Sequence, residues 1–338
     1  VAKHGDLLRV AVAHAGNDHR LGANEAPPAI ISIFLGDQLQ DVFDQIKAGG
    51  ARSSKEKGRL QLGVDTLPVL PKDAGDRNRT SPFAFTGNRF EFRAVGGHQA
   101  INEPQTALNT IFAESCDFVA TELEKSLAAG LSLGDAAQKV LKSIIDTHGR
   151  VIFNGNGYSA EWRAEAEKRG LPNLRTAVDA LPVLNTKEVI ELFDKYGVLT
   201  PAELHARYEI HVELYVKNVS LEGQTLAKIS KTQVLPAVLS YQTVLAQNVA
   251  ATKAAGVEGD TESLATVTKL LGSLKAANVK LEKALNDLPG EDLDGAKYAK
   301  DSILPAMADV RSAVDALETV LDYSLWPLPT YQEMLAIK

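Results

Sequence analysis

Arginine and glutamate residues gather in two short stretches of this sequence, at 16–28 and 76–93. The arginines are Arg20, Arg77, Arg79, Arg89 and Arg93, and the glutamates are Glu25 and Glu91. A guanidinium matches carboxylate or phosphate oxygens two at a time, and the chain as a whole carries a net charge of -7. A carboxylate among such groups suits a divalent cation or a reacting ammonium. The pattern indicates a site for phosphate and carboxylate chemistry.

The residues from Arg89 to Arg93 alternate charged and aromatic side chains, which predicts a β-strand. Arg89, Glu91 and Arg93 then share one face, and Phe90 and Phe92 share the other. We expect the aromatic face to pack on a core. The charged face must meet water, a cavity or a ligand, because burying unpaired charges is costly. A solvated strand face whose charges pair with one another is the alternative.

Several segments, taken in order, resemble glutamine synthetase, specifically its long type III form. They are RLGANEAPPAI from residue 20, NRTSPFAF from 78, RFEFR from 89, NEPQTALNTIFAESCD from 102, GYSAEWRAEAEKRGLPNL from 157, LTPAELHARYEI from 199 and LWPLPTYQEMLAIK from 325. The likeness covers nearly the whole chain and is weakest across about 221–322. It implies ATP-dependent ligation of ammonia to glutamate through γ-glutamyl phosphate.

The resemblance also implies roles toward glutamate and ammonia. Arg20 would hold a carboxylate of the substrate glutamate, and Arg93 would contact the substrate or the phosphorylated intermediate. Glu25 would lie on a flap over the glutamate and help to remove a proton from ammonium.

Three further residues would act on the nucleotide and the metal. Arg79 would contact the transferring phosphoryl group, Arg89 would contact ATP, and Glu91 would ligate Mg²⁺ or Mn²⁺. Phosphoryl transfer depends mainly on positioning and charge neutralisation, which arginines and metal ions supply. A second phosphate arginine, expected shortly after Arg79, has no counterpart in this sequence.

The upstream parts of the family, a β-grasp domain and strands with most of the metal carboxylates, also have no counterpart here. We therefore expect the C-terminal portion of a roughly twice-longer enzyme, inactive by itself. The expected fold class is α+β. Residues 1–220 would form the C-terminal part of the catalytic domain, with antiparallel strands, helices and an insert at about 37–72. Residues 221–338 would form an all-helical extension.

Composition agrees with a soluble globular protein, and we expect it to bind neither nucleic acid nor membrane. The pI is about 5.6, which argues against nucleic-acid binding. The longest apolar run, Ala29–Leu35, is too short to span a bilayer. Cys116, the only cysteine, is expected to be a small core residue and fits a reducing, cytoplasmic location. His205 and His211 are six residues apart, which does not align two metal ligands on a helix, so both are interpreted as structural.

Apolar periodicity predicts several elements. The run Leu7–His14 favours a strand, and Asp37–Ala48 favours a helix ended by Gly49 and Gly50. A helix over Pro104–Leu127 would place one apolar face on the core. That face comprises Leu108, Ile111, Phe112, Cys116 and Val119.

A heptad seam is the main feature of residues 221–322, where a helical hairpin or three-helix bundle is expected. Its members are Leu264, Val267, Leu271, Leu274, Asn278, Leu281, Leu285 and Leu288. Asn278 occupies an apolar position, either fixing the register or facing water at the rim of the bundle.

The family resemblance implies a large ring-shaped homo-oligomer, a dodecamer. Two alternatives to the glutamate–ammonia ligase stay open. One is a ligase that joins another amine to glutamate. The other is a non-catalytic homologue that serves as a helical scaffold, which would have no need of the arginines and glutamates above.

Overall fold

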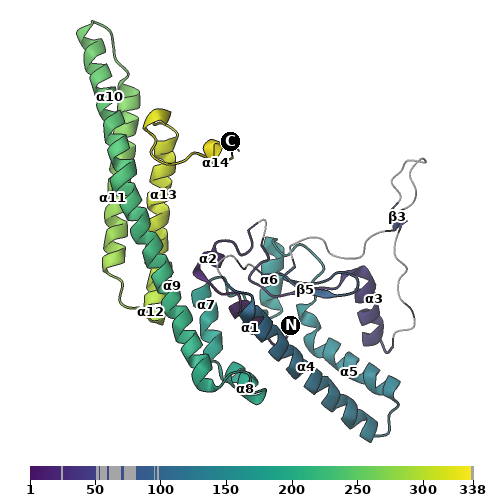
Figure 1. Cartoon of the computed structure of the whole chain (residues 1–338). Coiled ribbons are helices and arrows are strands. Elements are labelled where there is room, and N and C mark those ends of the chain that lie inside the picture. Colours follow the sequence, from purple (N-terminus) through teal and green to yellow (C-terminus); the bar gives the residue numbers. More distant parts are fainter. Residues whose placement is uncertain are drawn as a thin grey trace. The chain divides into compact units, whose positions relative to one another are not determined.

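A computed structural model describes most of the chain, which forms two compact units, Val1–His211 (unit 1) and Val212–Lys338 (unit 2) (Figure 1). The described residues are 1–23, 26–50, 53, 59–60, 70–71, 81–94, 96 and 99–335. Among them, no helix combines the length and apolar character needed to cross a membrane.

Unit 1 contains a small mixed sheet in the order β1-β4-β5. β1 (Ile33–Phe34) runs parallel to β4 (Phe83–Phe85), and β4 pairs antiparallel with β5 (Phe90–Phe92). The expectation of antiparallel strands is therefore right for β4–β5 and wrong for β1. A long connection separates β1 from β4, so the chain can return in the same direction, whereas β4 and β5 are joined by a tight turn. A separate antiparallel pair joins β2 (Arg59–Leu60) to β3 (Leu70–Pro71).

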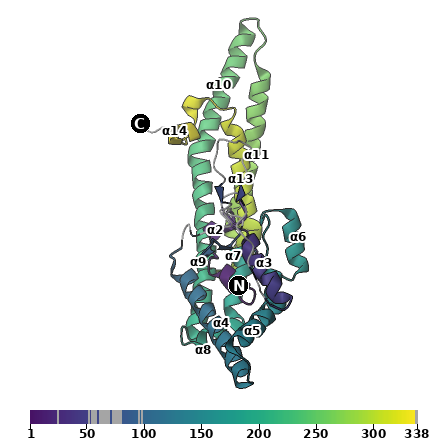
Figure 2. The same ribbon diagram turned by 90° about the vertical axis from the view of Figure 1, so that its right-hand side faces the viewer.

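Helices make up most of the rest of unit 1. They are α1 (Gly5–Val10), α2 (Ala15–Asp18), α3 (Gly36–Lys47), α4 (Asn102–Ala128), α5 (Leu133–His148), α6 (Ala160–Lys168), α7 (Ala177–Ala180), α8 (Lys187–Lys195) and the first part of α9 (Pro201–Ile229), with 3-10 turns at Gly149–Val151 and Leu181–Asn185. The predicted helices at Asp37–Ala48 and Pro104–Leu127 are confirmed as α3 and α4. α4 and α5 lie side by side (Figure 2).

The predicted strand at Leu7–His14 is wrong, because this segment contains α1 and the turn that follows it. Leu7, Leu8, Val10 and Val12 are all buried, so the segment is enclosed on every side. A short run that is apolar throughout carries no period that separates a strand from a buried helix.

The apolar face predicted for α4 is partly wrong. Ile111 is buried, but Phe112 is 68% exposed and Cys116 is exposed. Small side chains, Ala107 and Thr110, form the buried stripe together with Ile111. Apolar type alone does not place a residue inside, since much of a protein surface is apolar.

Unit 2 consists of helices in its described part. They are the remainder of α9, α10 (Leu235–Ala254), α11 (Thr261–Asn286), α12 (Leu293–Tyr298), α13 (Leu304–Glu318) and α14 (Tyr331–Leu335), with π-helical turns at Ser230–Val234 and Ala299–Ile303 and a 3-10 turn at Tyr323–Leu325. α11 packs along α13 and α10 (Figure 1). Central positions of the predicted heptad, including Leu271, Leu274 and Leu281, are buried.

Asn278 on α11 is 5% exposed, so the alternative of a water-facing rim position is wrong. Its Oδ1 is buried and has no hydrogen-bond partner in the described part of the chain. A buried polar atom without a partner costs about 1–3 kcal/mol. Asn278→Leu is therefore expected to raise the free energy of unfolding by about 1–2 kcal/mol in urea denaturation. A decrease would favour the register role instead.

Candidate functional site

β5 brings together the predicted carboxylate and two of its arginines. Arg89 donates from Nε and Nη2 to Glu91 Oε1 at 3.1 and 2.9 Å, and Arg93 Nη2 lies 3.4 Å from Oε2. Because side chains alternate along a strand, these three share one face. The predicted strand and its charged face are thus present in the structure.

The opposite face of β5 is aromatic, as expected. The Phe92 ring stacks on Phe83 with centroids 5.7 Å apart, and Phe90 lies 5.2 Å from Phe85. Phe90 nevertheless remains 47% exposed, so the core covers this face only in part. Phe90 also lines an open, mostly apolar cavity of about 600 Å³.

Exposure differs along the charged face. The side chains of Arg93, Glu91 and Arg89 are 16%, 34% and 72% exposed, respectively. The hydrogen bond from Arg89, helped by Arg93, holds the pKa of Glu91 below its usual value. Glu91 is therefore ionised at neutral pH. Both of its oxygens are engaged by guanidinium groups, which is the self-pairing named above as the alternative to a ligand site.

A metal ion would need more ligands than β5 provides. The described residues hold no cluster of three or more histidine, cysteine, aspartate or glutamate side chains able to bind one. Glu91 has the right donor chemistry for Mg²⁺ or Mn²⁺, which take oxygen ligands. One carboxylate between two guanidiniums does not fit a complete metal site.

Two predicted catalytic residues, Glu25 and Arg79, lie outside the described residues, as does Arg77. Arg20 is described and half-buried, in the turn after α2.

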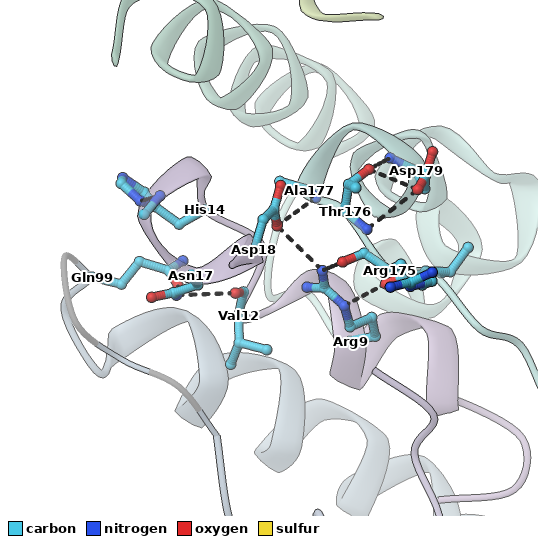
Figure 3. Close-up of polar contacts among 12 residues, drawn as sticks. Arg9, Val12, His14, Asn17, Asp18, Gln99, Arg175, Thr176, Ala177 and Asp179 are labelled. Carbon is cyan, nitrogen blue, oxygen red and sulfur yellow. Dashed lines mark hydrogen bonds and ion pairs between the residues drawn. The ribbon is translucent and has the colours of Figure 1, made fainter. Parts of the chain in front are cut away.

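The segment before Arg20 is anchored by two side chains (Figure 3). Asn17 is buried and donates from Nδ2 to the Val12 carbonyl at 3.2 Å and to Gln99 Oε1 at 3.0 Å. Asp18 accepts the backbone N–H of Ala177, at the start of α7, at 2.7 and 2.9 Å. These contacts tie the Arg20 segment to elements far away in the sequence.

Arg9 on α1 lies beneath this segment, with a side chain only 2% exposed. Its Nε donates to the Leu174 carbonyl at 2.7 Å, and its Nη2 lies 3.6 Å from Asp18 Oδ1 (Figure 3). A buried charge requires such a partner. Neither Arg9 nor Asp18 was predicted from the sequence to be important. The signal for Arg9 was a single charge inside the apolar run LLRVAVA, which demands a buried partner.

Burial raises the pKa of Asp18 from 3.8 to about 6, although the Ala177 N–H and Arg9 oppose the shift. The folded state thus binds this proton more tightly than the unfolded state. The stabilisation is present below pH 4 and is lost as the pH rises through about 6.

The free energy of unfolding of the wild type, relative to Asp18→Asn, should therefore fall by about 2 kcal/mol between pH 4 and pH 7. Urea denaturation of both proteins across this range measures it. A constant difference would show that the Asp18 proton is not held more tightly on folding.

Known proteins are similar to this chain over nearly its whole length. Residues 136–253 match the family model described as the glutamine synthetase C-terminal domain. A type-3 glutamine synthetase of Dictyostelium discoideum is 41% identical over 99% of the chain. The chain is similar to glutamine synthetases. The resemblance found in the sequence is thereby confirmed.

Two bacterial glutamine synthetases extend the comparison. That of Butyrivibrio fibrisolvens is 36% identical over 99% of the chain, and that of Bacteroides fragilis (strain YCH46) is 35% identical over 100%. The chain spans 47–48% of the length of these three relatives. Similarity to glutamine synthetases therefore runs along the whole chain but covers only about half of each relative.

Proposed function

We propose that the protein takes part in ATP-dependent ligation of ammonia to glutamate, giving glutamine. The observation that carries this proposal is the face of β5, where Glu91 is held between Arg89 and Arg93 within a chain related throughout to glutamine synthetases. In the proposed reaction the glutamate side-chain carboxylate attacks the γ-phosphate of ATP. Ammonia then displaces phosphate from γ-glutamyl phosphate.

On the glutamate side, Arg20 would bind a substrate carboxylate, and Arg93 the substrate or the acyl phosphate. The anchors at Asn17 and Asp18 support this role for Arg20, because a fixed backbone lowers the cost of orienting its side chain. Glu25 would accept a proton from ammonium.

On the nucleotide side, Arg89 would contact ATP and Arg79 the transferring phosphoryl group. The 72% exposure of the Arg89 side chain leaves it accessible to a ligand. Its guanidinium could then exchange Glu91 for phosphate oxygens, since both are anionic acceptors of bidentate bonds. Glu91 would contribute one carboxylate ligand to Mg²⁺ or Mn²⁺, which would neutralise phosphate charge when bound. The remaining ligands would come from outside the described residues.

The proposal also covers the cellular location, the assembly and the domain limits of the protein. We infer a cytoplasmic ring-shaped homo-oligomer, a catalytic part reaching to about residue 220, and a helical extension over 221–338. We also infer that the 338-residue chain by itself has little ligase activity, because one carboxylate on β5 does not complete a metal site.

Phosphate release by the full-length protein, supplied with ATP, Mg²⁺ and glutamate, tests the function. Release that requires ammonia supports glutamine synthesis. Release with methylamine or ethanolamine but not ammonia would favour a ligase for another amine. No release with any amine would favour a non-catalytic scaffold.

A further inference from the structure

A second cavity in unit 1 involves none of the residues assigned above. Its volume is about 300 Å³, and it lies among α1, α4, α8 and α9. Apolar side chains, including Leu7, Ala107 and Phe193, form about half of its accessible lining, and polar side chains from α4 and α9 form much of the rest. A cavity of this size and composition is typical of a small-molecule site.

The acidic group at this cavity already has partners. Glu103 Oε1 lies 2.9 Å from His211 Nε2, and Oε2 accepts a hydrogen bond from Gln99 at 3.4 Å. Burial disfavours the ionised form of Glu103, but the hydrogen bonds from His211 and Gln99 and the charges of His211 and Arg207 together outweigh it and lower the pKa. Glu103 is therefore ionised, and its negative charge is largely neutralised by neighbouring groups of the protein. It would attract a cationic ligand only weakly.

The basic group that lines the cavity is Arg207. Arg207 lies four residues before His211 on α9, so both side chains project from one side of the helix. Arg207 is exposed, and its charge helps to lower the pKa of Glu103 and Glu203, but no hydrogen bond or close ion pair engages its guanidinium in the described part of the chain. A guanidinium lining a partly apolar cavity can bind an anion through two parallel hydrogen bonds.

We propose that this cavity binds a small amphipathic monocarboxylate, with its apolar body against Leu7, Ala107 and Phe193 and its carboxylate on Arg207. An amine of the same shape would be repelled by Arg207 and would find Glu103 already paired. A neutral apolar molecule would gain the burial but not the charge-assisted hydrogen bonds. The inference stands independently of the ligase assignment.

Titration calorimetry with 3-phenylpropionate, and with 3-phenylpropylamine as the matched amine, tests the proposal on the 338-residue chain. We expect the carboxylate to bind at least about 10-fold more tightly than the amine. Arg207→Gln should weaken carboxylate binding by about 10-fold or more. Thr106→Leu, which adds bulk to the lining, should weaken binding of both molecules.

Arg163→Gln removes an exposed arginine that does not line the cavity, and it should leave binding unchanged. Thermal melting of each variant verifies that it is folded. Absence of carboxylate binding, equal binding of the amine, or unchanged binding in Arg207→Gln would overturn the proposal.

Discussion

Replacing Glu91 with alanine in the full-length protein should lower glutamate- and ammonia-dependent phosphate release by about 10³-fold or more. Glu91 is the anion that orients Arg89 and Arg93 on β5. Without it, two guanidinium groups lose their shared partner and repel each other. Misplacing groups that must meet the transferring phosphoryl is costly, because this chemistry depends on position and charge. A phosphate-release assay at saturating ATP and glutamate measures the effect.

The matched control is Glu165→Ala. Glu165 also pairs with an arginine in unit 1, since Arg169 Nε lies 2.9 Å from its Oε1. Removing it deletes a comparable ion pair without touching β5, so turnover should be retained. Glu91→Gln, which keeps the shape and removes the charge, should resemble Glu91→Ala. Normal turnover in both Glu91 variants would remove Glu91 from the site.

Arg9→Met should lower the free energy of unfolding by about 3–5 kcal/mol near pH 7. Methionine can fill much of the space, but it leaves Asp18 without its cation and the Leu174 carbonyl without its donor. An unpaired buried charge is among the most destabilising features that a single substitution can create. Urea denaturation monitored by circular dichroism measures the loss.

The double variant Arg9→Met, Asp18→Asn separates the charge from the packing. The asparagine removes the uncompensated carboxylate, so the double variant should be more stable than Arg9→Met alone. A single variant as stable as the wild type would mean that the pair contributes nothing. A double variant less stable than the single would mean that the Asp18 carboxylate acts mainly through Ala177.

Local patterns predicted the local structure well. The charge–aromatic alternation from Arg89 to Arg93 gave β5, and the glycines at 49 and 50 correctly ended α3, where both adopt positive φ. Heptad spacing identified buried positions such as Leu274 on α11. In each case the residues that decide the structure lie within a few positions of one another.

Tertiary pairing was not predictable in this way. Arg9 contacts Leu174, 165 positions away, and Asp18 contacts Ala177, 159 positions away. No periodicity links such residues, and α1 was mistaken for a strand because its surroundings bury every side. The prediction for Cys116 was wrong in the opposite sense. Its neighbours in the sequence are apolar, which favoured a core position, but the residue is exposed.

Within the candidate site, contacts between residues close together in the sequence were predictable, and contacts between distant segments were not. The Arg89–Glu91–Arg93 contacts follow from one strand, whereas the relation of Arg20 to β5 depends on how distant segments meet. Roles for Arg20, Glu25 and Arg79 came from family resemblance, and Glu25 and Arg79 fall outside the described residues. These roles stay predictions.

A structure of the full-length protein with Mg²⁺, glutamate and a non-hydrolysable ATP analogue tests the central claim most directly. We predict that a Glu91 oxygen lies about 2.0–2.2 Å from a metal ion, with Arg89 on the nucleotide and Arg93 on the glutamate side. Finding Glu91 still paired only with Arg89 and Arg93, facing solvent and remote from nucleotide and glutamate, would contradict it.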